Sequence, residues 1–287
     1  TLYWSGTSGT NAPLWSTLSA WSTLPGSWSP PTAVPGSADT AVFSLSSLTT
    51  PQDVYLGGSK SALGLTFSST NAAWLRGGAS GSPAVDTLGI GTGGISVGLG
   101  TGSVVIGTGS SDNVNVVLNG SQTWDNLDRG RRLIVSGSVA GSATSGNSQT
   151  LTVTGWGFTT LGGVLSDGGG GGVLNLTKTG SGALRLGNTA NTYSGTTTVS
   201  MGTLVISGSG SLGQGNSTVQ IAAGAASFSS GRLLLDGSQA PFELSRNLSL
   251  TGLVPKTSFT YPGYTLASIG SNTISGTIDS SATGAGT

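Results

Sequence analysis

Short runs of aliphatic residues recur along most of the chain and are separated by Gly, Ser, Thr and Asn. From Asp39 onward the runs follow one another at intervals of about eight to ten residues, and most of them alternate apolar with small or polar residues. A period of two is typical of a strand with one buried and one solvated face, and the intervening residues favour turns. The pattern therefore predicts strands at 41–43, 53–56, 63–67, 95–97, 103–106, 114–118, 133–135, 151–153, 173–176, 184–186, 203–206, 218–221 and 232–235.

Evenly spaced short strands are compatible with a sandwich, a propeller or a solenoid. Here the strands are short, many linkers are too short for the crossings of a sandwich, and the apolar residues are nearly all aliphatics that can stack on themselves. These features favour an all-β parallel solenoid, in which each strand pairs with its equivalent one turn later at about 4.8 Å. Two or three strands per turn predict coils of roughly 20–25 residues. Almost no helix is expected, because Gly or Pro interrupts every amphipathic window.

Residues 1–36 differ from the rest of the chain. Trp4, Trp15, Trp21 and Trp28 fall within this segment, interleaved with prolines. Prolines at this density exclude a central strand or a helix, whereas burial of indoles can order irregular chain. We expect an irregular cap, because a solenoid without one would expose an unpaired strand edge. The alternative interpretation is a tryptophan platform that stacks on sugar rings.

Three regions follow from these patterns. A Trp/Pro-rich cap or docking segment occupies 1–36, β-solenoid repeats occupy 37–240, and C-terminal coils or a docking segment occupy 241–287. The last region holds Phe259, Tyr261 and Tyr264 near prolines, a composition suited to docking or capping. The aromatic residues of the two end regions are therefore the candidate contacts for assembly or for glycans.

The composition excludes several classes of function. Gly contributes 51 of 287 residues, charged residues only 7%, and ten basic residues balance ten acidic ones. This balance gives no electrostatic footprint for nucleic acid, and no apolar stretch approaches the ~20 residues of a membrane span. His and Cys are absent, which removes disulfides, thiolate metal sites and histidine bases. We expect no metal and no cofactor, and abundant hydroxyl residues with few charges suit an extracellular protein.

Acidic residues are too scattered to suggest an enzyme. Glycoside hydrolysis needs two carboxyl groups across one bond, but the chain has a single Glu and mostly isolated Asp. Only Asp125 and Asp128 lie close together, and three basic residues stand beside them, Arg129, Arg131 and Arg132. We interpret this cluster as a solvated, self-paired loop, with a catalytic or acid-sugar site as the alternative. No catalytic residue is assigned, and the chain is predicted not to be an enzyme.

The most specific motif lies in a unit that runs from Leu176 to Gly224, and the first thirty or so residues of that unit read LTKTGSGALRLGNTANTYSGTTTVSMGTLVI. This stretch resembles the autotransporter-associated β-strand repeat, whose pattern is LTKxGxGxLxLxGxNTYxGxTxVxxGTLxV. The resemblance implies a right-handed parallel β-helix on the bacterial outer surface, in long secreted proteins that are passengers or adhesin-like structures. Residues 272–278 are similar to the strand that leads into a further repeat, so we expect the sequence to be part of a longer protein.

The residues of the motif have structural explanations. Gly180 and Gly182 flank a strand where we expect sharp turns with positive φ. Asn191 is placed for an amide that bonds main chain at a corner of the coil. Tyr193 is expected to fill the end of the core with its hydroxyl in water.

We predict an extracellular structural β-solenoid, a cell-surface passenger or a filament or sheath subunit that self-assembles through its ends. The expected partners are copies of itself or other cell-surface components, because strand edges at the ends of a solenoid can pair with a neighbour. The alternative is an adhesin or carbohydrate-binding passenger that uses its tryptophans, with glycans as partners. A polysaccharide-active enzyme is the third alternative.

Overall fold

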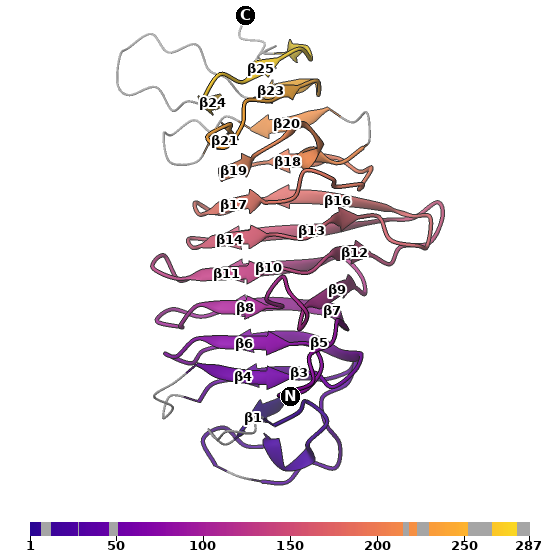
Figure 1. The fold of residues 1–287 in the computed structure, drawn as a ribbon, viewed down its shortest axis with the longest axis vertical. Coiled ribbons are helices and arrows are strands. Elements are labelled where there is room, and N and C mark those ends of the chain that lie inside the picture. The colour runs from indigo at the N-terminus through magenta and orange to yellow at the C-terminus, as the bar shows by residue number, and fades with distance from the viewer. Residues whose placement is uncertain are drawn as a thin grey trace, which may run out of the picture.

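The computed structural model describes residues 1–6, 13–27, 29–45, 51–214, 218–222, 230–251 and 266–279. These residues form a rod of stacked β-coils, with the N-terminus near its lower end and the C-terminal coils at its upper end (Figure 1). The solenoid has about eight parallel turns. Within the described ranges, helix is confined to two short 3-10 segments, η1 (Leu18–Ala20) and η2 (Ser209–Leu212). The predicted all-β solenoid is confirmed.

Most turns of the coil contribute strands to three faces. The first face has the strand order β2-β1-β3-β5-β7-β10-β13-β16-β18-β20-β23-β26, and its strands are β1 (Leu2–Trp4), β2 (Trp21–Ser22), β3 (Thr40–Phe43), β5 (Lys60–Phe67), β7 (Asp86–Val97), β10 (Gln122–Asn126), β13 (Ser148–Gly155), β16 (Val173–Lys178), β18 (Thr197–Val199), β20 (Val219–Ala222), β23 (Leu248–Thr251) and β26 (Ile278–Asp279). The second face is a nine-stranded sheet formed by β4 (Gln52–Tyr55), β6 (Ala73–Arg76), β8 (Val104–Ile106), β11 (Arg132–Val135), β14 (Phe158–Leu161), β17 (Ala183–Leu186), β19 (Gly202–Ile206), β21 (Gly231–Asp236) and β24 (Leu266–Ile269). The third face is formed by the first halves of β5 and β7 and by β9 (Val114–Leu118), β12 (Val139–Gly141), β15 (Leu165–Ser166), β22 (Glu243–Leu244) and β25 (Thr273–Ile274).

Coil length varies more than the sequence pattern predicted. Leu186 pairs with Ile206, twenty residues later, but Leu75 pairs with Ile106, thirty-one residues later. In the longer coil the extra residues form the turn at 77–85 and the extended strand β7, which bends from the third face to the first. The parallel register is kept in both cases, because extra residues leave the ladder at a corner.

Inward side chains stack in columns along the axis of the rod. On the first face Leu65, Ile95 and Trp124 follow one another in successive coils, and each is at most 1% exposed. The rings of Phe43 and Phe67 stack with centroids 4.9 Å apart and 12° between their planes. Burying one such side chain contributes about 1.5–3 kcal/mol. Because each side chain in a column packs against side chains of the neighbouring coils, the coils stabilise one another and do not fold singly.

The N-terminal end of the rod is closed by tryptophan side chains. The indoles of Trp4, Trp15 and Trp21 belong to residues that are at most 2% exposed. Trp15 donates its Nε1–H to Pro35 O at 3.1 Å, and Trp21 donates its own to Trp15 O at 2.8 Å. β2 lies antiparallel on the free edge of β1, and the backbone N–H of Trp15 donates to Tyr55 O of β4 at 2.7 Å. The predicted Trp-rich cap is confirmed, although it includes two short strands.

At the C-terminal end of the described chain, the core is not covered in the same way. Coils continue past Pro241 as β22 to β26. Ile278 of β26 pairs with Leu248, but Leu248 is 0% exposed whereas Ile278 is 48% exposed. Within the part of the chain that the structure describes, no strand pairs with the outer edge of β26. An inward-facing position of the last coil is therefore open at this end.

Candidate functional site

The motif at 176–206 forms one turn of the solenoid and part of the next, since Leu176 pairs with Thr197, and it contains an unusual core residue. Lys178 is 1% exposed and stands in the aliphatic column of the first face between Val153 and Val199. Its ammonium donates to Gly180 O at 2.7 Å and to Met201 O at 3.4 Å, and also to Thr179 O. Burial lowers the pKa of Lys178 to about 8. The lysine therefore fills the core and binds main-chain carbonyl groups at the corner between the first and second faces.

Three glycines let the main chain pass this corner. Gly180 has φ +68° and Gly202 has φ +74°, as required for left-handed turns. Gly182 is needed for a different reason from the one predicted, because a Cβ there would lie 2.1 Å from Gly157 O of the preceding coil. Close approach of two coils, rather than a positive φ, excludes a side chain at Gly182.

Asn191 and Tyr193 hold the next corner. The side chain of Asn191 accepts from the Leu165 N–H at 2.8 Å and donates to Ser211 O at 2.7 Å, so it bonds main chain in the coils on either side. The Tyr193 hydroxyl is buried and lies 2.7 Å from Thr197 Oγ1, and burial raises the pKa of Tyr193 to about 12. The expectation that this hydroxyl is in water was wrong. In the coil that follows, the Gly213 main chain packs against the ring of Tyr193 and leaves it no solvent face.

The family model of the passenger-associated-transport repeat matches residues 176–206. This chain carries that repeat. The match coincides with the turn built around Lys178, Gly180 and Asn191. Together with the solenoid fold it confirms the resemblance to autotransporter-associated repeat proteins. No curated protein matches the chain, and no solved structure matches it.

The passenger repeat also bears on location. Its family points to proteins of the bacterial cell surface or the extracellular space. Among the described residues, no helix has the length and apolar character needed to cross a membrane. The side chains of Lys178, Asn191 and Tyr193 in the repeat are hydrogen-bonded inside the coil.

The aromatic contacts predicted from sequence fall into two groups. Trp4, Trp15 and Trp21 lie in the core of the cap and present no ring to a ligand. The others lie outside the described residues, and their role in assembly or glycan contact stays a prediction: Trp28, Phe259, Tyr261 and Tyr264. Among the described tryptophans, Trp156 is the exposed one, at 48%, and the sequence analysis did not single it out. A single Trp between two glycines, Gly155 and Gly157, is the signal that could have found it.

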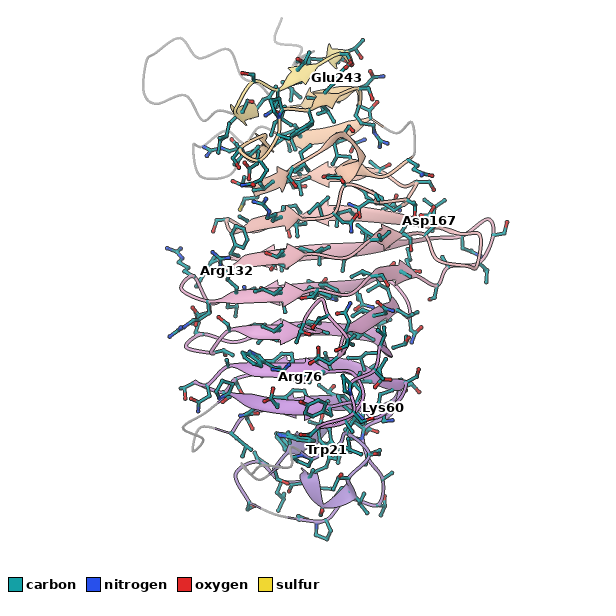
Figure 2. All side chains as sticks on the ribbon, viewed as in Figure 1. Trp21, Lys60, Arg76, Arg132, Asp167 and Glu243 are labelled. Atoms are coloured by element: carbon teal, nitrogen blue, oxygen red, sulfur yellow. The ribbon has the colours of Figure 1, made fainter. Side chains whose placement is uncertain are left out.

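The charged cluster at 125–132 is arranged differently from the prediction. No ion pair joins Asp125 or Asp128 to any of the three arginines, among the ion pairs found in the described chain. Instead, Arg129 lies over the ring of Trp156 and Arg132 over the ring of Phe158, each with its guanidinium carbon 5.2 Å from the ring centroid. Figure 2 shows Arg132 projecting from the left side of the rod. The interpretation as a self-paired loop was therefore wrong, although the arginines are exposed.

Two further features of the surface are a paired arginine and a polar groove. Arg76 bridges Asp53 at 2.6 Å and Asp112 at 2.7 Å and lies over Trp74 with its guanidinium carbon 4.5 Å from the ring centroid, so its charge is paired. A shallow polar groove crosses the outward side of β20, β23 and β26, and it is lined by Thr218, Gln220, Asn247, Leu248, Ser249, Thr277 and Asp279. With one carboxylate, this groove lacks the acid pair that hydrolysis requires.

Proposed function

We propose that the protein is a structural rod of the bacterial cell surface, a passenger-type segment that holds its two ends apart and catalyses no reaction. The observation that carries the proposal is the parallel pairing that runs from β3 to β26 around one hydrophobic core. Such a stack resists bending, because each coil is hydrogen-bonded to both neighbours along its faces. The passenger repeat supports a surface location.

The acidic residues support a role without catalysis. Asp86 accepts the N–H groups of Gly58 and Gly78 at 2.9 and 2.8 Å. Asp167 accepts the hydroxyl of Ser194 at 2.6 Å and the N–H of Leu174 at 2.7 Å. These carboxylates fasten one turn of chain to another, which is what a rod requires of its few charges.

The two ends of the rod support a passenger rather than a filament subunit. A filament built by head-to-tail strand pairing needs two complementary open edges. Here the N-terminal edge is covered by β2 and by Trp15, whereas the C-terminal edge around Ile278 is open. The described C-terminal edge therefore offers a place where a further coil, or a second copy of the chain, can add.

Small-angle X-ray scattering and negative-stain electron microscopy test the rod. We expect a particle whose long dimension is several times its width, and no release of reducing sugar from any polysaccharide in a substrate panel. A globular particle would contradict the rod, and depolymerisation that disappears in Asp125→Asn would contradict the non-enzymatic role.

Sedimentation equilibrium tests which end of the rod takes part in self-association. Substituting Ile278→Lys places a charge on the open end and is expected to weaken any self-association about tenfold. Leu18→Lys is the matched control, because Leu18 is 44% exposed on the closed cap. Growth of long filaments, or a larger effect of the Leu18 substitution, would show that copies meet through the cap instead.

A further inference from the structure

Three arginines and an exposed tryptophan meet on one corner of the rod. Arg129, Arg131 and Arg132 lie in and just after the turn that joins β10 to β11, and Trp156 lies in the turn that joins β13 to β14 one coil later. The register places the two turns side by side, since Arg132 pairs with Phe158 across the sheet. Three of the chain's ten basic residues thus gather within four positions.

Hydrogen bonds between side chains and main chain hold this corner rigid. Asn126, which is 0% exposed, donates its side-chain N–H to Phe158 O at 3.1 Å and accepts the Asp128 N–H at 3.2 Å. The Asp128 carboxylate in turn accepts the Gly130 N–H at 2.8 Å. The main chain beside Trp156 is equally fixed, because a Cβ at Gly157 would lie 2.4 Å from Asp128 O. The side chains therefore project from two turns whose relative position is set by the core.

The arginines of this corner form none of the ion pairs found in the described chain. Arg129 and Arg132 lie on aromatic rings, an arrangement that leaves their outward N–H groups free, and Arg131 is exposed. Asp125 and Asp128 offset part of the charge. However, the three guanidinium groups outnumber these two carboxylates, and one oxygen of Asp125 is buried. The exposed part of the corner is thus cationic and partly aromatic.

We infer that this corner binds an acidic polysaccharide, with guanidinium groups on its carboxylate or sulfate groups and Trp156 against a sugar ring. Planar guanidinium groups match such anions in bidentate geometry, and an exposed indole offers an apolar plate to the C–H face of a pyranose. A nucleic acid fits less well, because its affinity grows with the number of phosphates neutralised along a strand and the chain has no net charge. This inference goes beyond the proposed function, since a rod without sugar affinity would remain a rod.

Fluorescence titration tests the inference with four probes, a uronic-acid hexamer, a sulfated hexasaccharide, a neutral hexasaccharide and a single-stranded oligonucleotide. Trp156 is the exposed tryptophan of the described chain, so bound sugar is expected to shield part of the emission from acrylamide quenching. Binding of the uronate or the sulfated probe should weaken as salt rises. The stronger of these two identifies which acidic group the corner prefers.

Substitutions make the test specific to the corner. Arg131→Gln and Trp156→Ala are each expected to weaken binding about tenfold, the effect of one good contact. Arg185→Gln is the matched control, because Arg185 lies on the same face but is paired with Asp236 at 2.9 Å, and it should change binding less than about twofold. Thermal melting confirms that the surface variants remain folded. Equal affinity for the neutral probe, equal loss in the control variant, tighter binding of the oligonucleotide or no binding at all would overturn the inference.

Discussion

The ammonium of Lys178 donates to the carbonyl oxygen of Gly180 at 2.7 Å, so a charged group binds the main chain at the corner where Gly180 makes its turn. The side chain reaches that corner from a column otherwise occupied by apolar residues, with Val153 in the coil before it and Val199 in the coil after it. Burial penalises the charged form, while the surrounding carbonyl oxygens bind it. The passenger repeat thus keeps a titratable group inside its core.

Stability is expected to rise with pH between about 8 and 10.5. The pKa of Lys178 falls to about 8 in the folded chain from 10.5, so between these values the unfolded state binds more protons and unfolding becomes less favourable as pH rises. A shift from 10.5 to about 8 corresponds to about 3 kcal/mol at most. Urea unfolding at a series of pH values measures the slope. Lys178→Met should remove it, and an unchanged slope in that variant would mean that the ammonium is hydrated.

Tyr193 is expected to reverse the trend at higher pH. Burial raises its pKa to about 12 from 10.0, so between these values the unfolded state loses the proton first and stability falls as pH rises. Tyr193→Phe should flatten this fall, at the cost of the hydrogen bond to Thr197 Oγ1. Absorbance of tyrosinate during the pH series follows the ionisation directly. Titration of all five tyrosines near pH 10 in the folded chain would contradict the burial of this hydroxyl.

Gly182→Ala is expected to destabilise the chain by about 1–3 kcal/mol, the usual cost of overpacking. The added methyl would lie 2.1 Å from Gly157 O, and neither main chain can move without breaking the ladder between β14 and β17. Gly169→Ala is the matched control, because nothing lies within 4 Å of a Cβ at that position. Chemical denaturation of both variants decides the matter. Similar midpoints for the two would mean that the coils can separate at this corner.

Alternation of apolar residues predicted just over half of the strands on the first two faces, where most of the predicted strands bury every second side chain, and it missed others there, such as β6, β10 and β14. It missed the third face at β15, which is only two residues long, and at β7, whose Gly89 carries no side chain to show a period. The sequence also could not predict that Arg132 and Trp156 lie at one corner of the rod. The turns of this corner lie about one coil apart, and the spacing between paired residues of successive solenoid coils varies from twenty to thirty-three residues, so the sequence period could not place one turn above another.

Arg76→Gln is expected to destabilise the N-terminal half of the rod by about 1 kcal/mol. The guanidinium joins Asp53, one coil earlier, to Asp112, in the turn after β8. With side chains 16% and 13% exposed for Arg76 and Asp112, this pair is shielded from salt better than a surface pair. A double-mutant cycle with Asp112→Asn measures the coupling. A coupling energy near zero would show that the contact is only geometric.

Trp21→Leu is expected to destabilise the chain by about 2–4 kcal/mol, because it removes a fully buried indole and leaves the carbonyl of Trp15 without its donor. The substitution also loosens β2 over the edge of β1, and an uncovered strand edge promotes association. Trp156→Leu is the control, since Trp156 is 48% exposed and should melt like the parent chain. Urea unfolding gives the stability, and sedimentation velocity without denaturant gives the association state. If the Trp21 variant were destabilised but strictly monomeric, the cap would be a core element and not a guard of the edge.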